Sequence, residues 1–257
     1  MDVRTIFKLW KDFFVQIRSP LFMKFFFPLS FLFHYLLKKI GILLYPFPFM
    51  KIKLYNCIFL TRKRSIDFWV TWKKWEEDIT RWLLRKKRKG IFIDIGAHIG
   101  RYSILLAKNG WSVYSFEPLI QNFKILRFNA RMNNVNLNAF NIAVGNTIRR
   151  ASMFYTKGKF GEASLIKKQP ISQTIYIDKI DNVLENISPR GEMILKIDVE
   201  GNEYNVILGA KKFIKKFRPI IIVEIWKEKG KKVINLLRHL GYRKFGFRWV
   251  YTKKINL

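Results

Sequence analysis

The 257-residue sequence predicts an α/β fold built on a largely parallel sheet, and three observations support this. From Ile91 onward, short apolar runs alternate with amphipathic stretches of roughly 10–15 residues, the pattern of parallel strands joined by helical crossovers. A glycine-bearing turn, Gly96–Gly100, follows the first of these runs and precedes a helix, which is where an α/β fold holds a small ligand. Hydrophobic residues make up 49% of the chain and charged residues 26%, a globular balance that argues against wholesale disorder.

The first 50 residues differ in composition from the rest, so we expect an extension over residues 1–50 and one domain over residues 51–257. Met1–Ser19 has the pattern of a basic amphipathic helix, and the stretch that follows is intensely apolar but interrupted by charges and prolines. Its longest apolar portion, Phe25–Leu37, is shorter than the roughly 20 residues that span a bilayer. We favour an anchor lying in the membrane plane over a spanning helix. Packing of these aromatics onto the domain or a partner subunit is the structural alternative.

The chain is strongly basic, with 49 Lys and Arg against 18 Asp and Glu and a net charge of +31. Such a charge favours an anionic partner, which includes nucleic acid, acidic lipid headgroups and phosphorylated glycans. A proteome-wide lysine bias explains it equally well. The single cysteine, Cys57, excludes an intramolecular disulfide and a cysteine-based zinc site. We therefore expect a buried thiol and a cytoplasmic protein, with membrane association through residues 1–50.

Residues 51–90 predict one strand, a turn and a helix. Lys51–Leu60 alternates as a strand does, and Thr61–Ser65 is expected to be a turn with solvated charges. Ile66–Leu84 has apolar residues at three- and four-residue spacing, which predicts a helix. The basic run Arg85–Gly90 suits the C-terminus of that helix, and we place this interpretation before a nucleic-acid-binding signal.

The remaining elements follow from the alternation of apolar runs and amphipathic stretches. Strands are expected at Ile91–Ile95, Ser112–Phe116, Leu137–Ala143, Met193–Ile197 and Pro219–Ile225, with helices at Tyr102–Asn109, Gln121–Asn133, Glu203–Phe217 and Glu228–Gly241. An inserted pair of antiparallel strands, Ala151–Tyr155 and Thr174–Ile180, flanks a loop over Thr156–Pro170. Two short strands near Lys244–Phe247 and Trp249–Thr252 end the chain.

The glycine turn has the pattern D-x-G-x-x-x-G from Asp94 to Gly100, whereas a dinucleotide site needs the three glycines of G-x-G-x-x-G. Asp94 would repel a pyrophosphate but attract a cation, and S-adenosylmethionine carries a sulfonium and an ammonium and no phosphate. Glu117 ends the next strand, where an acid binds ribose hydroxyls. We therefore predict this cofactor; helix capping by Asp94 and a surface turn at Glu117 are the alternatives. The expected cofactor contacts are Asp94, Gly96, Ala97, His98, Gly100, Ser103, Glu117, Pro118 and Ala143.

A second group of polar residues follows Met193–Ile197. Strand alternation places Lys196, Asp198 and Glu200 on one face, and Glu224 ends the adjoining strand. Carboxylates that converge on one cleft raise one another's pKa, which favours a general base, so Asp198, Glu200 and Glu224 are the catalytic candidates. They could instead hold a divalent metal, although no histidine is evident nearby and we predict none; a structural cap is the other alternative.

These motifs resemble those of the FkbM-type methyltransferase family. The resemblance rests on FIDIGAHIGRYS, VYSFEP, NNVN, GEASL, LKIDVEGNEYNVILGA and IIVEI and covers roughly Arg62 to Tyr242. It implies a Rossmann-like class I methyltransferase sheet with a small inserted β-hairpin, to which the apolar N-terminal extension is added. It also implies S-adenosylmethionine as cofactor and methylation of a hydroxyl on a sugar or natural product. Asp94, Gly96, Gly100 and Glu117 become cofactor contacts, and Asp198 and Glu200 active-site candidates. His98 stands where the family often has Asn.

We therefore predict an S-adenosylmethionine-dependent O-methyltransferase that acts on a sugar, a glycan or a lipid-linked hydroxyl. The net charge of +31 makes an RNA methyltransferase the first alternative. It is weakened because the strand Met193–Ile197 is followed neither by an Asn-Pro-Pro-Tyr-like motif nor by a cysteine. A non-catalytic module that keeps the fold and binds a membrane surface is the second alternative.

Overall fold

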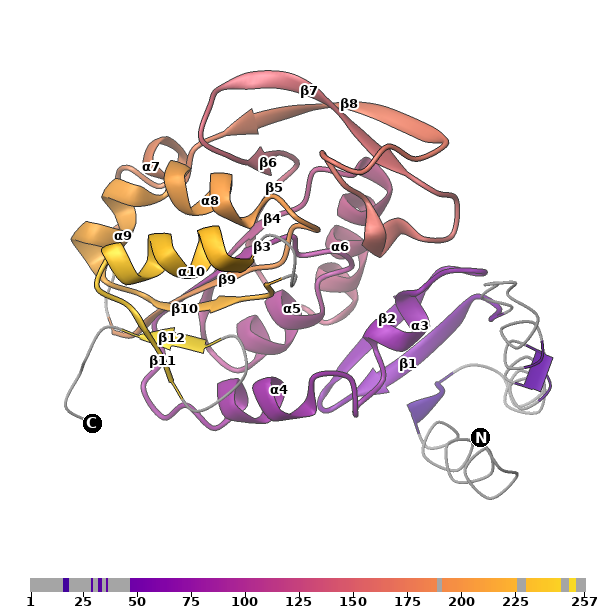
Figure 1. Ribbon diagram of the computed structural model, residues 1–257. Coiled ribbons are helices and arrows are strands. Elements are labelled where there is room, and N and C mark those ends of the chain that lie inside the picture. Colours follow the sequence, from indigo (N-terminus) through magenta and orange to yellow (C-terminus); the bar gives the residue numbers. More distant parts are fainter. Residues whose placement is uncertain are drawn as a thin grey trace.

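The computed structural model describes residues 16–18, 29, 32–33, 36, 47–188, 191–225, 230–245 and 250–252, and its centre is a seven-stranded sheet. The strand order is β11-β12-β10-β9-β3-β4-β5 (Figure 1). The strands are β3 (Ile91–Ile95), β4 (Ser112–Phe116), β5 (Asn138–Phe140), β9 (Met193–Ile197), β10 (Ile220–Val223), β11 (Arg243–Lys244) and β12 (Val250–Thr252). The five strands from β5 to β10 are parallel, whereas β12 runs antiparallel to both β10 and β11. The predicted α/β class with a parallel sheet is confirmed.

Helices cover both faces of this sheet, as the buried strands require. Strand alternation divides the core: Phe92 packs with α4 (Glu77–Leu84) and α5 (Arg101–Lys108), and Ile93 packs with the helices of the opposite face. Those helices are α7 (Ile180–Val183), α8 (Glu203–Gly209), α9 (Lys211–Phe217) and α10 (Gly230–His239) (Figure 1). The single helix predicted over Glu203–Phe217 is therefore two helices, because the chain breaks at Ala210.

The strand predicted over Lys51–Leu60 is a hairpin of β1 (Met50–Leu54) and β2 (Cys57–Thr61). A two-residue turn joins them, with Leu54 paired to Cys57 and Tyr55 at a φ of 52°. The hairpin packs on α5 and on α6 (Ile120–Met132), and two asparagines, one in α6 and one directly after it, bind the backbone of β2. Asn133 accepts from Ile58 N at 2.7 Å and Asn129 accepts from Leu60 N at 2.8 Å. The hairpin is thus joined to the helix that follows β4.

The helix predicted over Ile66–Leu84 is two helices, α3 (Asp67–Val70) and α4, joined by a turn in which Glu76 has a φ of 45°. The physical reason lies in Arg101, at the start of α5. Its guanidinium donates hydrogen bonds to the carbonyl oxygens of Val70, Trp72 and Trp75, which therefore need no helical partner. The segment between α3 and α4 is held in place by this one buried arginine.

A second sheet of order β6-β8-β7 contains the predicted inserted hairpin, and its strands are β6 (Ala143–Val144), β7 (Arg149–Tyr155) and β8 (Ile171–Asp178). The strand predicted over Leu137–Ala143 was too long, since β5 ends at Phe140 and Ala143 belongs to this second sheet. A short 3₁₀ helix, η1 (Phe160–Glu162), lies in the loop of the hairpin.

Most of the N-terminal extension, including most of the predicted anchor region, lies outside the described residues. Within it, Ile17 is buried and pairs with Ile52 of β1. Among the described residues, no helix combines the length and the apolar character needed to cross a bilayer. Cys57 is buried, as predicted, and burial raises the pKa of its thiol to about 11.

Candidate active site

The candidate site lies where the chain reverses its direction across the sheet. From β3 the chain continues to β4 and β5 on one side, and it later returns to β9 and β10 on the other. Such a switch point leaves a crevice at the carboxyl ends of the strands. Here it is a cavity of about 520 Å³, lined by residues that follow β3, β4, β9 and β10.

The glycine turn after β3 is required by close packing against the chain after β9. Gly96 has a φ of 84°, and a Cβ there would collide with the carbonyl oxygen of Asp198. Gly96 and the adjoining Ala97 line the cavity. Gly100 has a φ of 88° at the start of α5 and packs on Ile104; within the described chain it is not among the lining residues.

Asp94 is 1% exposed at the end of β3, and its two oxygens have different surroundings. Ser103 Oγ donates to Asp94 Oδ2 at 2.6 Å, and Ser115 Oγ donates to Ser103 Oγ at 2.8 Å. Asp94 Oδ1 has no hydrogen-bond partner in the part of the chain that the structure describes, and Lys196 Nζ lies 3.9 Å away. Burial raises the pKa of Asp94, against the effects of Lys196 and Ser103. Asp94 does not cap α5, which begins after Gly100.

Glu117 is 4% exposed, so it is not part of a surface turn. Its Oε2 accepts from the backbone N–H of His98 at 2.8 Å, and its Oε1 accepts from Leu119 N at 2.9 Å and from Asn122 Nδ2 at 3.3 Å. Burial raises the pKa of Glu117 to about 7, although these hydrogen bonds oppose the shift. Because a carboxylate offers about four acceptor positions and three are taken here, about one remains for a ribose hydroxyl. Pro118 and Ala143 line the cavity beside it.

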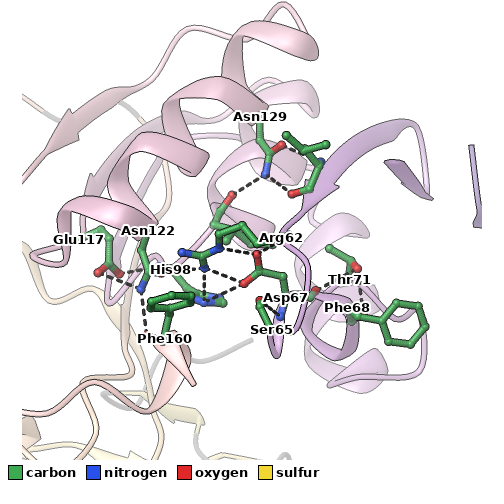
Figure 2. Close-up of polar contacts among 12 residues, drawn as sticks. Arg62, Ser65, Asp67, Phe68, Thr71, His98, Glu117, Asn122, Asn129 and Phe160 are labelled. Carbon is green, nitrogen blue, oxygen red and sulfur yellow. Dashed lines mark hydrogen bonds and ion pairs between the residues drawn. The ribbon is translucent and has the colours of Figure 1, made fainter. Parts of the chain in front are cut away.

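His98 has a φ of 51° and lines the cavity, but its ring is turned toward a buried polar network (Figure 2). Its Nε2 lies 3.4 Å from Asp67 Oδ1 and 3.4 Å from Arg62 Nη2. Burial lowers the pKa of His98 to about 4, so the ring is neutral near pH 7. The backbone of His98 therefore supports Glu117, while its ring contacts the ion pair behind the glycine turn.

That ion pair, Arg62 with Asp67, was not predicted from the sequence. Arg62 Nε donates to Asp67 Oδ2 at 2.7 Å and Arg62 Nη2 donates to Asp67 Oδ1 at 2.7 Å (Figure 2). Nη2 also donates to Asn122 Oδ1 at 2.8 Å, and the guanidinium carbon lies 4.3 Å from the centre of the Phe160 ring. The expectation of solvated charges over Thr61–Ser65 is wrong for Arg62, whose side chain is 11% exposed. No local sequence motif indicates this role.

The other half of the cavity is lined by carboxylates that surround Lys196. Its Nζ donates to Asp198 Oδ2 at 3.1 Å and lies 5.2 Å from the centre of the Tyr102 ring. Tyr102 Oη in turn donates to Glu76 Oε2 at 2.7 Å. Burial alone would lower the pKa of Lys196, but Asp198 and Asp94 raise it, so the lysine is charged. Lys196 was predicted to share a face with Asp198 and Glu200 without a role of its own, and Tyr102 and Glu76 were not predicted as site residues.

Glu200 and Glu224 line the same part of the cavity. Burial, followed by the charge of Asp198, raises the pKa of each to about 8. Strand alternation does not place Glu200 here, because β9 ends at Ile197 and Glu200 has a φ of 53°. Its backbone oxygen accepts a hydrogen bond from Ser164 of the inserted loop at 3.0 Å. Within the described chain, no group of three acidic, histidine or cysteine side chains is arranged to hold a metal ion.

The structure thus brings together ten of the twelve predicted site residues in the lining of one cavity, and a hydrogen bond joins Ser103 to that lining through Asp94. The lining members are Asp94, Gly96, Ala97, His98, Glu117, Pro118, Ala143, Asp198, Glu200 and Glu224. Three features define a class I methyltransferase fold. They are a parallel sheet in which β12 lies antiparallel between β10 and β11, a glycine turn after β3, and an acidic residue after β4.

The comparison with protein families identifies the group within this class. Residues 94–244, more than half of the chain, match the model described as the Methyltransferase FkbM domain. The chain therefore belongs to the FkbM methyltransferase family, as the sequence motifs predicted, and the cofactor of this family is S-adenosylmethionine. Arg62, Asp67 and Glu76 precede the matched region. The comparison with curated protein sequences found no match.

Similar solved structures include an FkbM methyltransferase from Methylobacillus flagellatus KT, with 19% identity and a TM-score of 0.46; the match covers 64% of this chain and 43% of that one. Another is the Pyrococcus abyssi tRNA (uracil-54, C5)-methyltransferase in complex with S-adenosyl-L-homocysteine, with 15% identity and a TM-score of 0.44. That match covers 76% of this chain and 38% of the other. The matches thus span less than half the length of each of these two proteins.

Proposed function

We propose that this chain transfers the methyl group of S-adenosylmethionine to a hydroxyl group of a sugar, in a glycan or linked to a lipid. The observation that carries the proposal is the arrangement around Lys196. Its Nζ lies 3.9 Å from Asp94 Oδ1 on the cofactor side and 3.1 Å from Asp198 Oδ2 on the other side. A single cavity therefore joins the residues suited to a cationic donor with carboxylates suited to a hydroxyl.

The residues on the donor side fit this cofactor. Asp94 Oδ1 is a buried carboxylate oxygen without a hydrogen-bond donor among the described residues, and an ammonium group would satisfy it. Gly96 leaves the backbone of the turn free of a side chain, and Glu117 has about one acceptor position left for a ribose hydroxyl. Ala97, His98, Pro118 and Ala143 complete the proposed cofactor contacts, with Gly100 and Ser103 supporting the turn. When bound, S-adenosylmethionine supplies an electrophilic methyl group on a cationic sulfur.

On the acceptor side, the chain must hold a hydroxyl and take its proton. Asp198 is paired with Lys196, so we assign it the task of orienting the hydroxyl. Glu200 and Glu224, whose pKa values burial raises to about 8, are the candidates that accept the proton. Positioning of the hydroxyl supplies most of the acceleration, because methyl transfer is an in-line displacement at carbon.

Calorimetry and methyl-transfer assays on the intact chain test the proposal. We expect S-adenosylmethionine to bind, with at least tenfold weaker binding for Asp94→Asn, because the cation then loses its counter-charge. Incubation with methyl-labelled cofactor and separate envelope-glycan, lipid and RNA fractions should place the label on a sugar hydroxyl. Label found in RNA would support the nucleic-acid alternative instead. Absence of cofactor binding would overturn the enzyme proposal and favour the binding module.

A further inference from the structure

Two walls of the cavity come from segments outside the central sheet, and both combine exposed apolar and basic side chains. The first is the turn between α3 and α4, where Trp75 is 39% exposed and, with Lys74, lines the cavity. The second is the loop between β7 and β8, where Leu165 lines the cavity and Ile166 is 46% exposed. A large apolar side chain beside a lysine recurs on both sides of one opening.

The basic side chains of these two walls face outward. Lys74, Lys157 and Lys167 are all exposed, and Lys167 is near enough to Glu200 to affect its pKa. Three acidic residues of the two walls are accounted for as follows: Glu76 accepts from Tyr102 inside the cavity, Glu162 of the β7–β8 loop lines the cavity, and Glu77 pairs with Arg81 at 2.7 Å. Asp78 remains exposed. The cavity therefore has carboxylates within it and mostly cations around its opening.

The N-terminal extension joins the domain beside the same opening. The ring of Phe47 stacks on Phe68 of α3 at a centroid distance of 4.2 Å, and Arg64 N donates to the carbonyl oxygen of Phe47 at 2.8 Å. Ile66 N donates to the carbonyl oxygen of Gly158 at 3.3 Å, which joins this region to the β7–β8 loop (Figure 1). Phe47 therefore lies beside α3 and beside the segment Arg64–Ile66 that contacts the β7–β8 loop.

We propose that the cavity opens toward an anionic lipid bilayer through a rim formed by Lys74, Trp75, Lys157, Ile166 and Lys167. Lysines are attracted to acidic headgroups, and tryptophan and isoleucine insert among them, so this composition suits the surface of a bilayer. The inference rests on the proposed function in one respect: a membrane-facing opening admits a hydroxyl acceptor that is linked to a lipid. The docking itself can be tested without methyl transfer.

Hydrogen exchange on the intact chain locates the contact. With phosphatidylglycerol vesicles, amides of residues 72–76 and 164–168 should exchange several-fold more slowly, and those of α9 should be unchanged. Vesicles of phosphatidylcholine should protect the rim much less, because they lack the negative charge. Protection confined to residues before Phe47 would overturn the proposal, since the extension would then bind the membrane without the rim.

A charge-matched pair of variants separates the rim from net charge. The rim variant carries Lys74→Gln, Lys157→Gln and Lys167→Gln, and the control carries Lys211→Gln, Lys212→Gln and Lys215→Gln on α9, whose lysines are also exposed. We expect vesicle affinity to fall at least tenfold for the rim variant and less than about twofold for the control. Equal losses of vesicle affinity in the two variants would contradict the proposed rim. A loss of affinity in the rim variant that is larger for an RNA oligonucleotide than for vesicles would also contradict it.

Calorimetry with S-adenosylmethionine keeps the two proposals apart. Both variants should bind the cofactor within about twofold of the unaltered chain, because none of the substituted residues is among the proposed cofactor contacts. If the unaltered chain fails to bind the cofactor, the proposed function fails while the vesicle result stands. If the cofactor binds but the rim variant keeps its vesicle affinity, only the docking inference fails.

Discussion

The Arg62–Asp67 ion pair gives a sharp test of how the fold supports the cofactor side of the cavity. Asp67 is fully buried, and it receives two side-chain hydrogen bonds from Arg62, each of 2.7 Å. Removing one partner of a buried pair leaves an uncompensated charge, which costs about 3–5 kcal/mol. We expect Arg62→Met to lower the free energy of unfolding by that amount at pH 7. The control Arg85→Met, at an exposed arginine, should change it by less than about 0.5 kcal/mol.

The pH dependence of the free energy of unfolding shows whether ionised Asp67 stabilises or destabilises the fold. Burial alone would raise the pKa of Asp67, but its hydrogen bonds and ion pair with Arg62 hold it below the ordinary value of 3.8. In the unaltered chain this carboxylate therefore stabilises the fold at neutral pH, and the contribution is lost as the pH falls through the lowered value. In Arg62→Met, burial raises the pKa, so ionisation opposes folding as the pH rises. The two proteins should differ most near pH 7 and least near pH 4.

A double variant separates stability from positioning. Arg62→Met combined with Asp67→Asn removes both charges and keeps an acceptor for the backbone, so most of the lost unfolding free energy should return. Affinity for S-adenosylmethionine should stay about tenfold lower, because Arg62 also orients Asn122, which bonds Glu117. Urea unfolding and calorimetry measure the two quantities. Full recovery of affinity in the double variant would refute the positioning role, and an unchanged unfolding free energy in Arg62→Met would refute the argument from burial.

The glycine turn and the proposed base provide two further predictions. Gly96→Ala should abolish measurable cofactor binding in calorimetry, because its Cβ would displace the chain after β9. In the control Gly110→Ala, the glycine has a similar φ of 86° without that collision. The control should therefore lower the free energy of unfolding in urea but leave cofactor binding unchanged. The proton acceptor must be ionised, so kcat/KM should rise with pH toward about 8, the value to which burial raises the pKa of Glu200 and Glu224. In pH–rate profiles, replacing the residue that acts as the base, by Glu200→Gln or Glu224→Gln, should remove this rise of kcat/KM with pH and lower the rate about 100-fold or more. If both variants keep the rise, neither glutamate is the base.

Strands that are buried and bounded by charges or glycine were predicted to the residue. The predicted bounds of β3, β4 and β9 agree with the structure at both ends. Glycines flank β3, acidic residues flank β9, and Glu117 follows β4, so the sequence marks where these strands stop. The hairpin of β1 and β2 was predicted as one strand because its turn, Tyr55–Asn56, contains no glycine or proline. The break between α3 and α4 was missed for a different reason. Their apolar spacing remains helical, and the carbonyl oxygens between them are bound by a distant arginine.

The candidate site likewise contains residues that the sequence predicted and residues that it did not. Asp94, Gly96 and Glu117 were predicted because their positions at strand ends imply their surroundings before any packing is known. Asn122 and Tyr102 were not, because each acts through a partner distant in the sequence: Asn122 receives a hydrogen bond from Arg62, and Tyr102 donates one to Glu76. Sequence periodicity indicates which face of an element is buried, but not which buried polar groups meet.

The partners that contact the site from a distance in the sequence all precede the segment that matches the family. Arg62 follows the hairpin, Asp67 begins α3 and Glu76 precedes α4, yet they contact His98, Asn122 and Tyr102 inside the matched region. A chain trimmed to residues 94–244 would keep all twelve predicted site residues, although it would lose the first part of β3. It would also leave Asn122 without the guanidinium that fixes it, and α5 without the turn that Arg101 holds. The predicted site residues therefore depend on the segment before residue 94 for the contacts that hold Asn122 and the start of α5.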